Sequence, residues 1–373
     1  MITTFANACG KEHYVALEAP QGLPFHTALQ ELMARYDAVL AANDMTRDSA
    51  VFWRFHVSDI FTQAQTLRQV LADYEQSVMI SFMQQAPASG SKVAMMAYHI
   101  EPAAGPVVKK PNGDGFEIAH GAYRSIWGRL LPRHKAPSYA QTTNILDSLS
   151  SIMRDHGGTV RDNVMRTWFY VRDIDNNYQG MVDARREWFA DEGMTRDTHY
   201  IASTGIEGCA ERVSDLVQTD YLAVLGLEAE QVQYMSALTH LNPTHDYGVT
   251  FERATNVTYG DRRHYYISGT ASINNRGKVV HVGDVIKQTE RTFENINALL
   301  EGYDATLDDM KMMVVYLRDL SDYPMVTDYL DQRMPSQTAY IVVQGAVCRP
   351  TWLIEMDGIA IKANGNSTFD PFC

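Results

Sequence analysis

Glu355 is the residue of this sequence whose surroundings most favour acid chemistry. It lies in the run Trp352-Leu353-Ile354-Glu355-Met356, where a charged side chain among apolar neighbours is unusual. Burial in such a strand removes hydration from the carboxylate, raises the pKa of the carboxyl group and lets it stay protonated near neutral pH. The alternative is a carboxylate on an edge strand that faces water. We favour the buried position and predict that Glu355 belongs to a functional site.

Cysteine and histidine show no spacing typical of a metal site. The cysteines are Cys9, Cys209, Cys348 and Cys373, without a CxxC pair or a zinc-type partner histidine. His240 and His245 lie across a proline-containing stretch and lack the i,i+4 spacing of a helical zinc site. Neither a GxGxxG nor a Walker pattern for phosphate binding is present. We therefore expect no metal and no cofactor.

Composition excludes several classes of protein. The 373 residues are 45% hydrophobic and 21% charged, which fits two or three globular domains. The formal net charge is -13 and the basic residues are dispersed, so nucleic acid is not an expected partner. No run approaches the ~18 apolar residues of a membrane span, and the first residues do not resemble a signal peptide. Sparse cysteine suits a reducing compartment, so we expect a cytoplasmic protein without membrane contact.

Three segments of the chain share one order of elements, which indicates an internal repeat. Each has an amphipathic helix, an apolar strand that ends in an acidic turn, a second helix and closing strands. The first helices are expected at residues 27–43, 142–156 and 284–303, the strands at 51–57, 163–171 and 310–317, and the second helices at 62–73, 178–190 and 323–332. The strands end in Ser58-Asp59-Ile60, Arg172-Asp173-Ile174 and Arg318-Asp319-Leu320. We interpret the segments as three diverged copies of one unit.

The repeat predicts an α/β (α+β) chain of three tandem units, at residues 1–105, 116–226 and 245–363. Residues 102–115 are rich in proline and glycine and are expected to be a mobile surface linker. Residues 225–246 are expected to begin as a helix that breaks near Pro243. The alternative is that any α/β protein alternates such elements and that the acidic turns match by chance.

The third copy resembles the Rid (YjgF-like) superfamily. The similar motifs are Tyr265–Ser272 (YYISGTAS), Gly283–Asn295 (GDVIKQTERTFEN) and Leu353–Ala360 (LIEMDGIA). Rid proteins are trimers of a chorismate-mutase-like αβ unit, with ligand clefts between neighbouring units. The resemblance implies that three joined units form an intramolecular pseudo-trimer, which is a monomer or a small homo-oligomer in solution.

Two positions differ from the Rid enamine/imine deaminases. Those enzymes hold the substrate carboxylate with an arginine fifteen residues before the glutamate that matches Glu355, and this sequence has Tyr340 there. The tyrosine of their opening Gly-Pro-Tyr segment falls near Phe251. Both differences argue against a simple transfer of deaminase activity to this chain.

A further resemblance, over about residues 120–361, is to the chorismatases, Rid-related enzymes that act on chorismate. It rests on Arg166–Tyr170 (RTWFY), Asp173-Ile174, Tyr178, Arg185, Ala202–Gly208, Phe251–Ala254, Ser268–Ser272 and the pair Cys348 and Glu355. The resemblance implies cleavage of chorismate to pyruvate and a hydroxybenzoate or a dihydroxycyclohexadienoate. The first copy adds nothing diagnostic.

Chorismate chemistry assigns roles to these residues. Its two carboxylates need cationic anchors, and its enol-ether pyruvyl group needs an acid that protonates the methylene carbon. We assign Arg185 and Arg253 as the anchors and Glu355 as the acid. An exposed helix arginine is an equally open interpretation of Arg185, because Arg186 adjoins it.

The remaining site residues are Cys348, placed with Glu355 in the catalytic set, and Tyr178 and Gly269, placed in the substrate-binding set. Cys348 can also be a small buried hydrophobe, the more frequent place of a lone cysteine. Gly269 and Cys348 resemble the branch that makes 3-hydroxybenzoate, whereas the hydrolase branch carries alanine.

Two other functions remain open at this point: a Rid-type enamine/imine deaminase, and a non-catalytic protein that binds a small molecule. In each case the expected partner is a small-molecule carboxylate. The expected site is the cleft between the second and third units.

Overall fold

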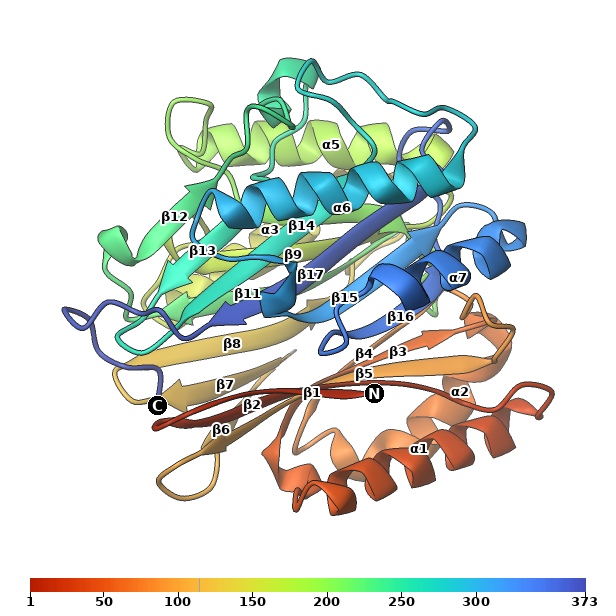
Figure 1. Ribbon diagram of the computed structural model, residues 1–373, viewed down its shortest axis with the longest axis vertical. Coiled ribbons are helices and arrows are strands. Elements are labelled where there is room, and N and C mark those ends of the chain that lie inside the picture. The colour runs from red at the N-terminus through yellow and green to blue at the C-terminus, as the bar shows by residue number, and fades with distance from the viewer. Residues whose placement is uncertain (114) are drawn as a thin grey trace.

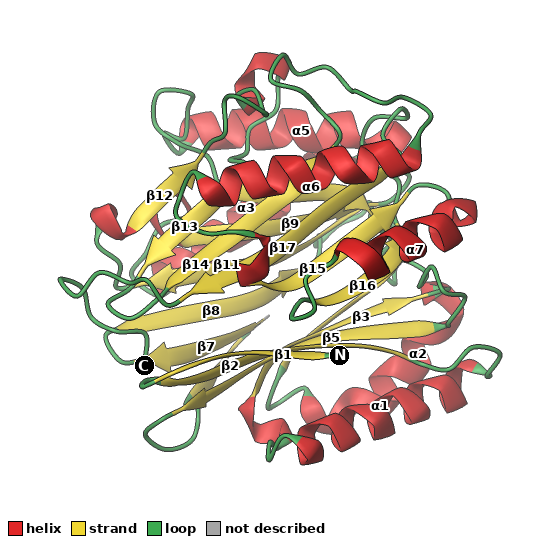
Figure 2. Ribbon diagram, in the orientation of Figure 1, coloured by secondary structure: helices red, strands yellow, loops and turns green. Residues whose placement is uncertain are grey.

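The computed structural model describes residues 1–113 and 115–373. The strands form three sheets, each from one third of the chain, and the helices lie outside the strands (Figures 1 and 2). Each sheet holds one parallel pair of strands, β3 with β4, β9 with β10 and β15 with β16. The predicted mixed fold of three tandem units is therefore confirmed.

The strands follow the same order in each third, except that the second and third sheets have one additional edge strand. The first sheet has the order β1-β2-β5-β3-β4 and consists of β1 (Ile2–Asn7), β2 (Gly10–Glu18), β3 (Ala50–Val57), β4 (Met79–Gln84) and β5 (Val93–Pro102). The second, β10-β9-β11-β8-β7-β6, consists of β6 (Lys109–Asn112), β7 (Gly115–His120), β8 (Tyr123–Leu130), β9 (Val164–Val171), β10 (Ala202–Glu207) and β11 (Val217–Leu225). The third, β12-β13-β14-β17-β15-β16, consists of β12 (Val232–Met235), β13 (Ala254–Thr258), β14 (Arg263–Ala271), β15 (Met310–Leu317), β16 (Ala339–Gln344) and β17 (Ile354–Lys362).

Two helices accompany each sheet. The first helices are α1 (Phe25–Ala42), α3 (Ser138–Asp155) and α6 (Val285–Glu301), and the second helices are α2 (Ile60–Leu71), α5 (Ile174–Asp191) and α7 (Tyr323–Arg333). The short helix α4 (Val160–Asn163) precedes β9. Single 3-10 turns occur at η1 (Arg47–Ser49), η2 (Ala72–Tyr74), η3 (Ala229–Gln231), η4 (Thr244–Tyr247), η5 (Leu307–Asp309) and η6 (Leu320–Asp322).

The acidic turn that recurs after a strand in each unit lies at the start of the second helix of that unit. The Asp59 carboxylate accepts a hydrogen bond from the backbone N–H of Phe61 at the start of α2, and Asp319 does the same for Ser321 before α7. Such a cap satisfies one of the backbone donors that a helix start leaves unpaired. Asp173 holds the same place before α5 in a left-handed conformation, with φ 48°.

Two segments between the units differ from expectation. The predicted linker at residues 102–115 contains β6, which pairs with β7. Because β6 is an edge strand, Pro111 costs no central ladder hydrogen bond there. The helix expected after Leu225 is wrong: the chain forms η3 and then β12, whose alternating side chains pair with β13.

Buried ion pairs join the units where the inner faces of the sheets meet. Arg54 of β3 lies 3.0 Å from Asp220 of β11, and Arg166 of β9 lies 3.3 Å from Asp357 of β17. Between the third and first units, Arg262 pairs with Glu12 at 2.5 Å. Replacing one partner would leave a buried charge uncompensated, so the contacts between units are sensitive to substitution at these pairs.

The carboxyl end of the chain returns to the first unit. Phe372 is buried against Tyr259 and His264, and a disulfide joins Cys373 to Cys9. Nothing in the cysteine spacing predicted this pairing, which brings together residues 364 positions apart. No described helix is long and apolar enough to cross a membrane.

Candidate functional site

A cavity of about 360 Å³ lies between the second and third units. Its walls come from α5 and β10 of the second unit, and from β14, β17 and the segment at residues 248–253 of the third. The structure brings all six predicted site residues to this cavity: Tyr178, Arg185, Arg253, Gly269, Cys348 and Glu355. Their placement together is a structural fact, and their roles remain predictions.

Glu355 is 5% exposed on β17 and faces this cavity. Burial, followed by the nearby carboxylate of Asp357, raises the pKa of Glu355 to about 8, although Arg166 and Arg253 act in the opposite direction. The carboxyl group therefore holds a proton at neutral pH. A buried acid of this kind can donate that proton to a bound molecule.

Gly269 makes room for the Glu355 carboxyl. The pairing of β14 with β17 shifts register between Ile267 and Thr270, so Gly269 lies at an irregular point of the ladder. A Cβ atom at this position would lie 2.3 Å from Oε1 of Glu355. Any larger residue must displace the acid, since atoms do not approach so closely without repulsion.

Arg185 is buried in α5, at 2% exposure, which excludes the exposed-helix interpretation. Its Nη1 donates to the hydroxyl of Ser203 at 3.2 Å, and its Nε donates to Thr250 at 3.3 Å. These bonds fix a guanidinium group at the cavity wall. The adjacent Arg186 also lines the cavity, but its side chain is 47% exposed and pairs with Asp183.

Arg253 supplies the second buried guanidinium group, at 6% exposure. Its Nη2 donates to the backbone carbonyl of Asn242 at 2.9 Å, and the guanidinium lies 5.4 Å from the ring centre of Phe251. Arg349 also lines the cavity and lies over the ring of Trp352 at 4.7 Å. Several guanidinium groups around one cavity form an environment for a ligand with more than one carboxylate.

Cys348 is a neutral thiol in this cavity. Burial and the neighbouring Glu355 raise the pKa of Cys348 to about 12. Because a nucleophilic cysteine needs an accessible thiolate, this environment does not favour covalent catalysis. Cys348 can instead shape the cavity beside the acid.

Asp357, two residues after Glu355 on β17, belongs to a buried polar cluster. The carboxylate of Asp357 accepts hydrogen bonds from Thr204 at 2.7 Å and from Tyr316 at 3.1 Å, and pairs with Arg166. Sequence reasoning left Asp357 out of the site, although side chains two apart on a strand share a face. It also missed Ser203 and Arg349, which line the cavity.

The position expected to carry the deaminase arginine lies elsewhere. Tyr340 is half-buried on β16, and its hydroxyl forms a 3.3 Å hydrogen bond with Asp331 of α7. It lines a different cavity, between the third and first units. Phe251, by contrast, does line the candidate site. Within the described residues, no group of three or more histidine, cysteine, aspartate or glutamate side chains is placed to hold a metal ion.

Comparison with known proteins places the chain in a family. Residues 255–362 match the family model described as Endoribonuclease L-PSP. The 3-aminoacrylate deaminase RutC of Acinetobacter baylyi is 32% identical over 96 residues, which are 26% of this chain and 76% of the relative. The chain belongs to the Rid superfamily. A RutC family protein of Pyrococcus abyssi matches this Rid chain at 34% identity over 98 residues, 26% of this chain and 77% of the relative.

The fold of the whole Rid chain is similar to that of another protein, whose crystal structure is known. A chorismatase superposes with a TM-score of 0.62 and 17% sequence identity, covering 95% of this chain and 100% of the chorismatase chain. The two proteins therefore share a fold throughout, including the first unit, which carries no diagnostic motif.

Proposed function

We propose that this protein is a chorismatase-like enzyme that cleaves chorismate to pyruvate and a hydroxybenzoate. The observation that carries the proposal is the buried Glu355 carboxyl, with a pKa of about 8, in a cavity that also holds the buried guanidinium groups of Arg185 and Arg253. This pairing of a neutral acid with cations suits a dianionic substrate that reacts on protonation. The shared fold of a chorismatase supports the same function.

In the proposed reaction the two guanidinium groups bind the substrate carboxylates. Glu355 donates its proton to the methylene carbon of the enolpyruvyl group, which places positive charge on the ether carbon. Water adds to that carbon, and the hemiketal that forms breaks its bond to the ring-bound oxygen, which releases pyruvate and leaves a hydroxyl group on the ring. The product at this point is the dihydroxycyclohexadienoate, and one water molecule has been consumed. Loss of the other ring hydroxyl together with a ring hydrogen, as water, gives 3-hydroxybenzoate, so that product consumes no net water.

Gly269 and Cys348 favour 3-hydroxybenzoate as the aromatic product. A Cβ at position 269 would meet the Glu355 carboxyl at 2.3 Å, so an alanine there requires another position of the acid. The glycine thus fits an acid that lies against β14. Cys348, beside the same acid, is the second residue shared with the 3-hydroxybenzoate branch.

The decisive experiment incubates the purified protein with chorismate and measures pyruvate, with chromatography of the aromatic product. We expect pyruvate release by the wild type, and a loss of at least about a hundredfold in Glu355→Gln, the range for removal of a general acid. Equal release by both proteins would contradict the assignment of Glu355, and no release by either would contradict the function.

A Rid-type deaminase is the second candidate, because the chain is 32% identical to a 3-aminoacrylate deaminase over 96 residues. Ammonia release distinguishes the two functions, since hydrolysis of an enamine yields ammonia and cleavage of chorismate does not. Faster ammonia release from 2-aminoacrylate, without turnover of chorismate, would reverse the order of the candidates. A purely binding protein would show thermal stabilisation by chorismate without either product.

A further inference from the structure

Each contact between units contains a cavity built from equivalent elements. The second helix and the last parallel strand of one unit face the opening strands of the next. Between the first and second units, α2, β4 and β8 enclose about 550 Å³. Between the third and first units, α7, β16 and β2 enclose about 260 Å³. The candidate active site is the corresponding cavity between the second and third units, so the chain holds three versions of one site.

The strand registers identify the residues equivalent to Glu355. On β17, Ile354 pairs with Leu317, the last residue of β15; on β11, Val217 pairs with Val171, the last residue of β9. The next residue along each strand is therefore Glu355 in the third unit and Gln218 in the second. A second correspondence agrees: the backbone N–H of Leu353 donates to Oε1 of Gln288, and that of Leu216 donates to Oε1 of Gln141.

Gln218 replaces the acid by an amide that cannot donate a proton. It is fully buried, and its Nε2 donates to Ser81 at 3.2 Å, while Nη2 of Arg129 donates to its Oε1 at 3.4 Å. In the first unit the same register places Ala94 beside Val93, which pairs with Val57. The cavities between the other units thus lack the proposed acid.

The cavity between the first and second units nevertheless keeps a concentration of positive charge. Four arginines line it: Arg68, Arg129, Arg133 and Arg212. Glu75 is the one acidic residue among its described lining residues, and the corresponding cavity between the third and first units has no lining arginine or lysine in the described part of the chain. Four guanidinium groups at one cavity are unexpected on a chain with a net charge of -13.

The four side chains are held to different degrees. Arg68 forms a bidentate pair with Glu211, and Arg129 lies over the Phe82 ring at 4.3 Å. Arg212 donates to Asp215 at 2.7 Å. Arg133 is exposed, and its guanidinium group has no partner among the described residues.

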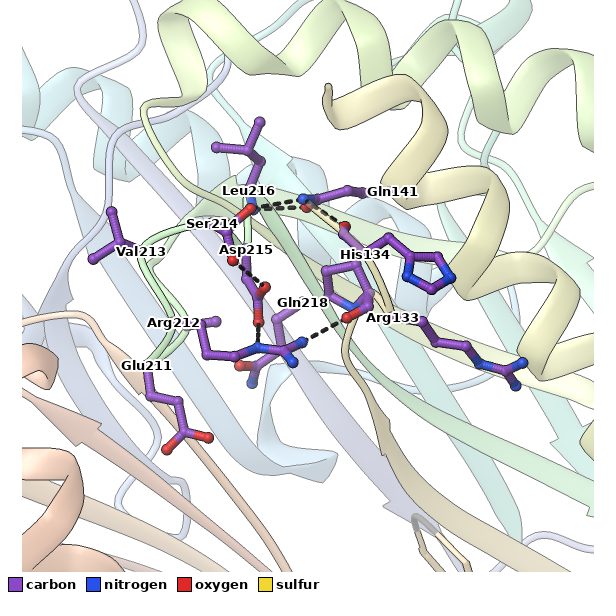
Figure 3. A network of polar contacts seen from close by, with 12 residues as sticks. Arg133, His134, Gln141, Glu211, Arg212, Val213, Ser214, Asp215, Leu216 and Gln218 are labelled. Atoms are coloured by element: carbon purple, nitrogen blue, oxygen red, sulfur yellow. Dashed lines mark hydrogen bonds and ion pairs between the residues drawn. The ribbon is translucent and has the colours of Figure 1, made fainter. Parts of the chain in front are cut away.

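Hydrogen bonds hold the loop that carries Arg212 in place (Figure 3). Arg212 reaches across from its loop and donates to the carbonyl of Pro132 at 2.5 Å, next to Arg133. Gln141 bridges the same two segments, because its Nε2 donates to the carbonyl of Ser214 at 2.7 Å and to that of His134 at 3.4 Å. The guanidinium group of Arg212 is therefore positioned before any ligand arrives, which lowers the entropic cost of binding.

We propose that the cavity between the first and second units binds a small polyanion, a ligand with two or more carboxylate or phosphate groups, without converting it. Planar guanidinium groups recognise both kinds of oxyanion through paired hydrogen bonds. At the position of the proposed acid stands Gln218, a buried amide that accepts a hydrogen bond from Arg129, so a bound molecule meets no equivalent of Glu355. This inference does not depend on the reaction proposed for the other cavity.

Methyl NMR of methionine can test the proposal at each cavity separately. Met79 is one of the residues that line the cavity between the first and second units, whereas the methyl group of Met181 lies next to Gly205 in the candidate active site. The probes are citrate and pyrophosphate, at constant ionic strength. We expect a saturable shift of the Met79 signal; a response to citrate alone identifies carboxylates, to pyrophosphate alone identifies phosphates, and to both identifies oxyanions in general.

Two variants make the assignment specific. Arg133→Ala should weaken the affinity read at Met79 by about tenfold, the effect of losing one charge-assisted hydrogen bond. Arg196→Ala is the matched control, because Arg196 is 70% exposed and lines neither cavity. No saturable Met79 shift with either probe, or an affinity that Arg133→Ala leaves unchanged, would overturn the proposal. Turnover of chorismate, if present, should be equal in both variants, so the two proposals fail independently.

Discussion

The Glu355 carboxyl should give the proposed reaction a characteristic dependence on pH. Its pKa is raised to about 8, mainly by burial, so the acid is protonated below that pH and loses its proton above it. We predict that kcat/KM for chorismate is flat between about pH 6 and 7 and falls tenfold per unit well above pH 8. Steady-state rates across this range test the prediction. A profile that rises through pH 8 would show that the carboxylate, not the acid, is the active form.

The same burial predicts that Glu355 lowers the stability of the folded protein as the pH rises from about 4 to 8. An unfolded glutamate has a pKa near 4.3. Between that value and about 8, the folded state binds a proton that the unfolded state has lost, so the free energy of unfolding falls as the pH rises. Glu355→Gln should therefore raise the stability at pH 8 by a few kcal/mol, on the order of 1.4 kcal/mol for each unit of pKa difference. Thermal denaturation at pH 5 and pH 8 should show a larger gain at pH 8.

Gly269 should be sensitive to the addition of a single methyl group. The Cβ of Gly269→Ala would lie 2.3 Å from Oε1 of Glu355, so the acid must move. We expect kcat for chorismate to fall by about a hundredfold, as for other misplaced catalytic groups, in a protein that still folds. Gly302→Ala is the control, because the nearest atom to its Cβ would lie at 3.5 Å. Equal rates in both variants would separate Gly269 from the positioning of the acid.

Much of each unit is readable in the sequence at the scale of elements. The strand predicted at residues 310–317 is β15 with the same bounds, and the acidic turns predicted the starts of α2, α5 and α7. The opening strands were mostly missed. In β1 and β2 apolar and polar residues mix without a strong period, and β6 contains a proline, so pairing with neighbours rather than local preference decides their structure.

The site was predictable only where its residues lie on regular elements. Arg185 and Glu355 are on α5 and β17, and the residues around them in the sequence indicated that both belong to a site. Arg349 and Thr250 lie in loops, and Thr250 meets Arg185 from 65 residues away. Such contacts depend on how the second and third units pack, which no local pattern encodes.

Gln141 of α3 and Gln288 of α6 make the same contact in two units. Each accepts a hydrogen bond from the backbone just before the closing strand of its unit. Gln288 is fully buried, accepts from Leu353 at 2.9 Å and donates to the carbonyl of Thr351 at 2.9 Å. Gln288→Ala leaves these backbone groups unpaired, and we predict a loss of about 2–3 kcal/mol in the free energy of unfolding. Chemical denaturation measures it. The control Gln332→Ala, on the exposed face of α7, should change stability by less than about 0.5 kcal/mol.

At the scale of the whole molecule, the disulfide joins the two ends of the chain. Cys9 lies between β1 and β2, and Cys373 follows the buried Phe372, so the bond fastens the third unit to the first. We predict that Cys373→Ser lowers stability by about 2–4 kcal/mol in oxidising buffer and has little effect in the presence of a thiol reductant. Cys209→Ser should show no such dependence, because Cys209 is a free thiol. Equal melting temperatures with and without reductant in the wild type would contradict the prediction.

The three equivalent positions Glu355, Gln218 and Ala94 show what is gained by joining the units in one chain. In an assembly of identical subunits every substitution is repeated at each contact, so a destabilising buried carboxyl would be present three times. A tandem chain escapes that symmetry. A buried acid then destabilises only one contact between units. The equivalent positions at the other two contacts can hold residues that stabilise the packing of the units or bind a different ligand.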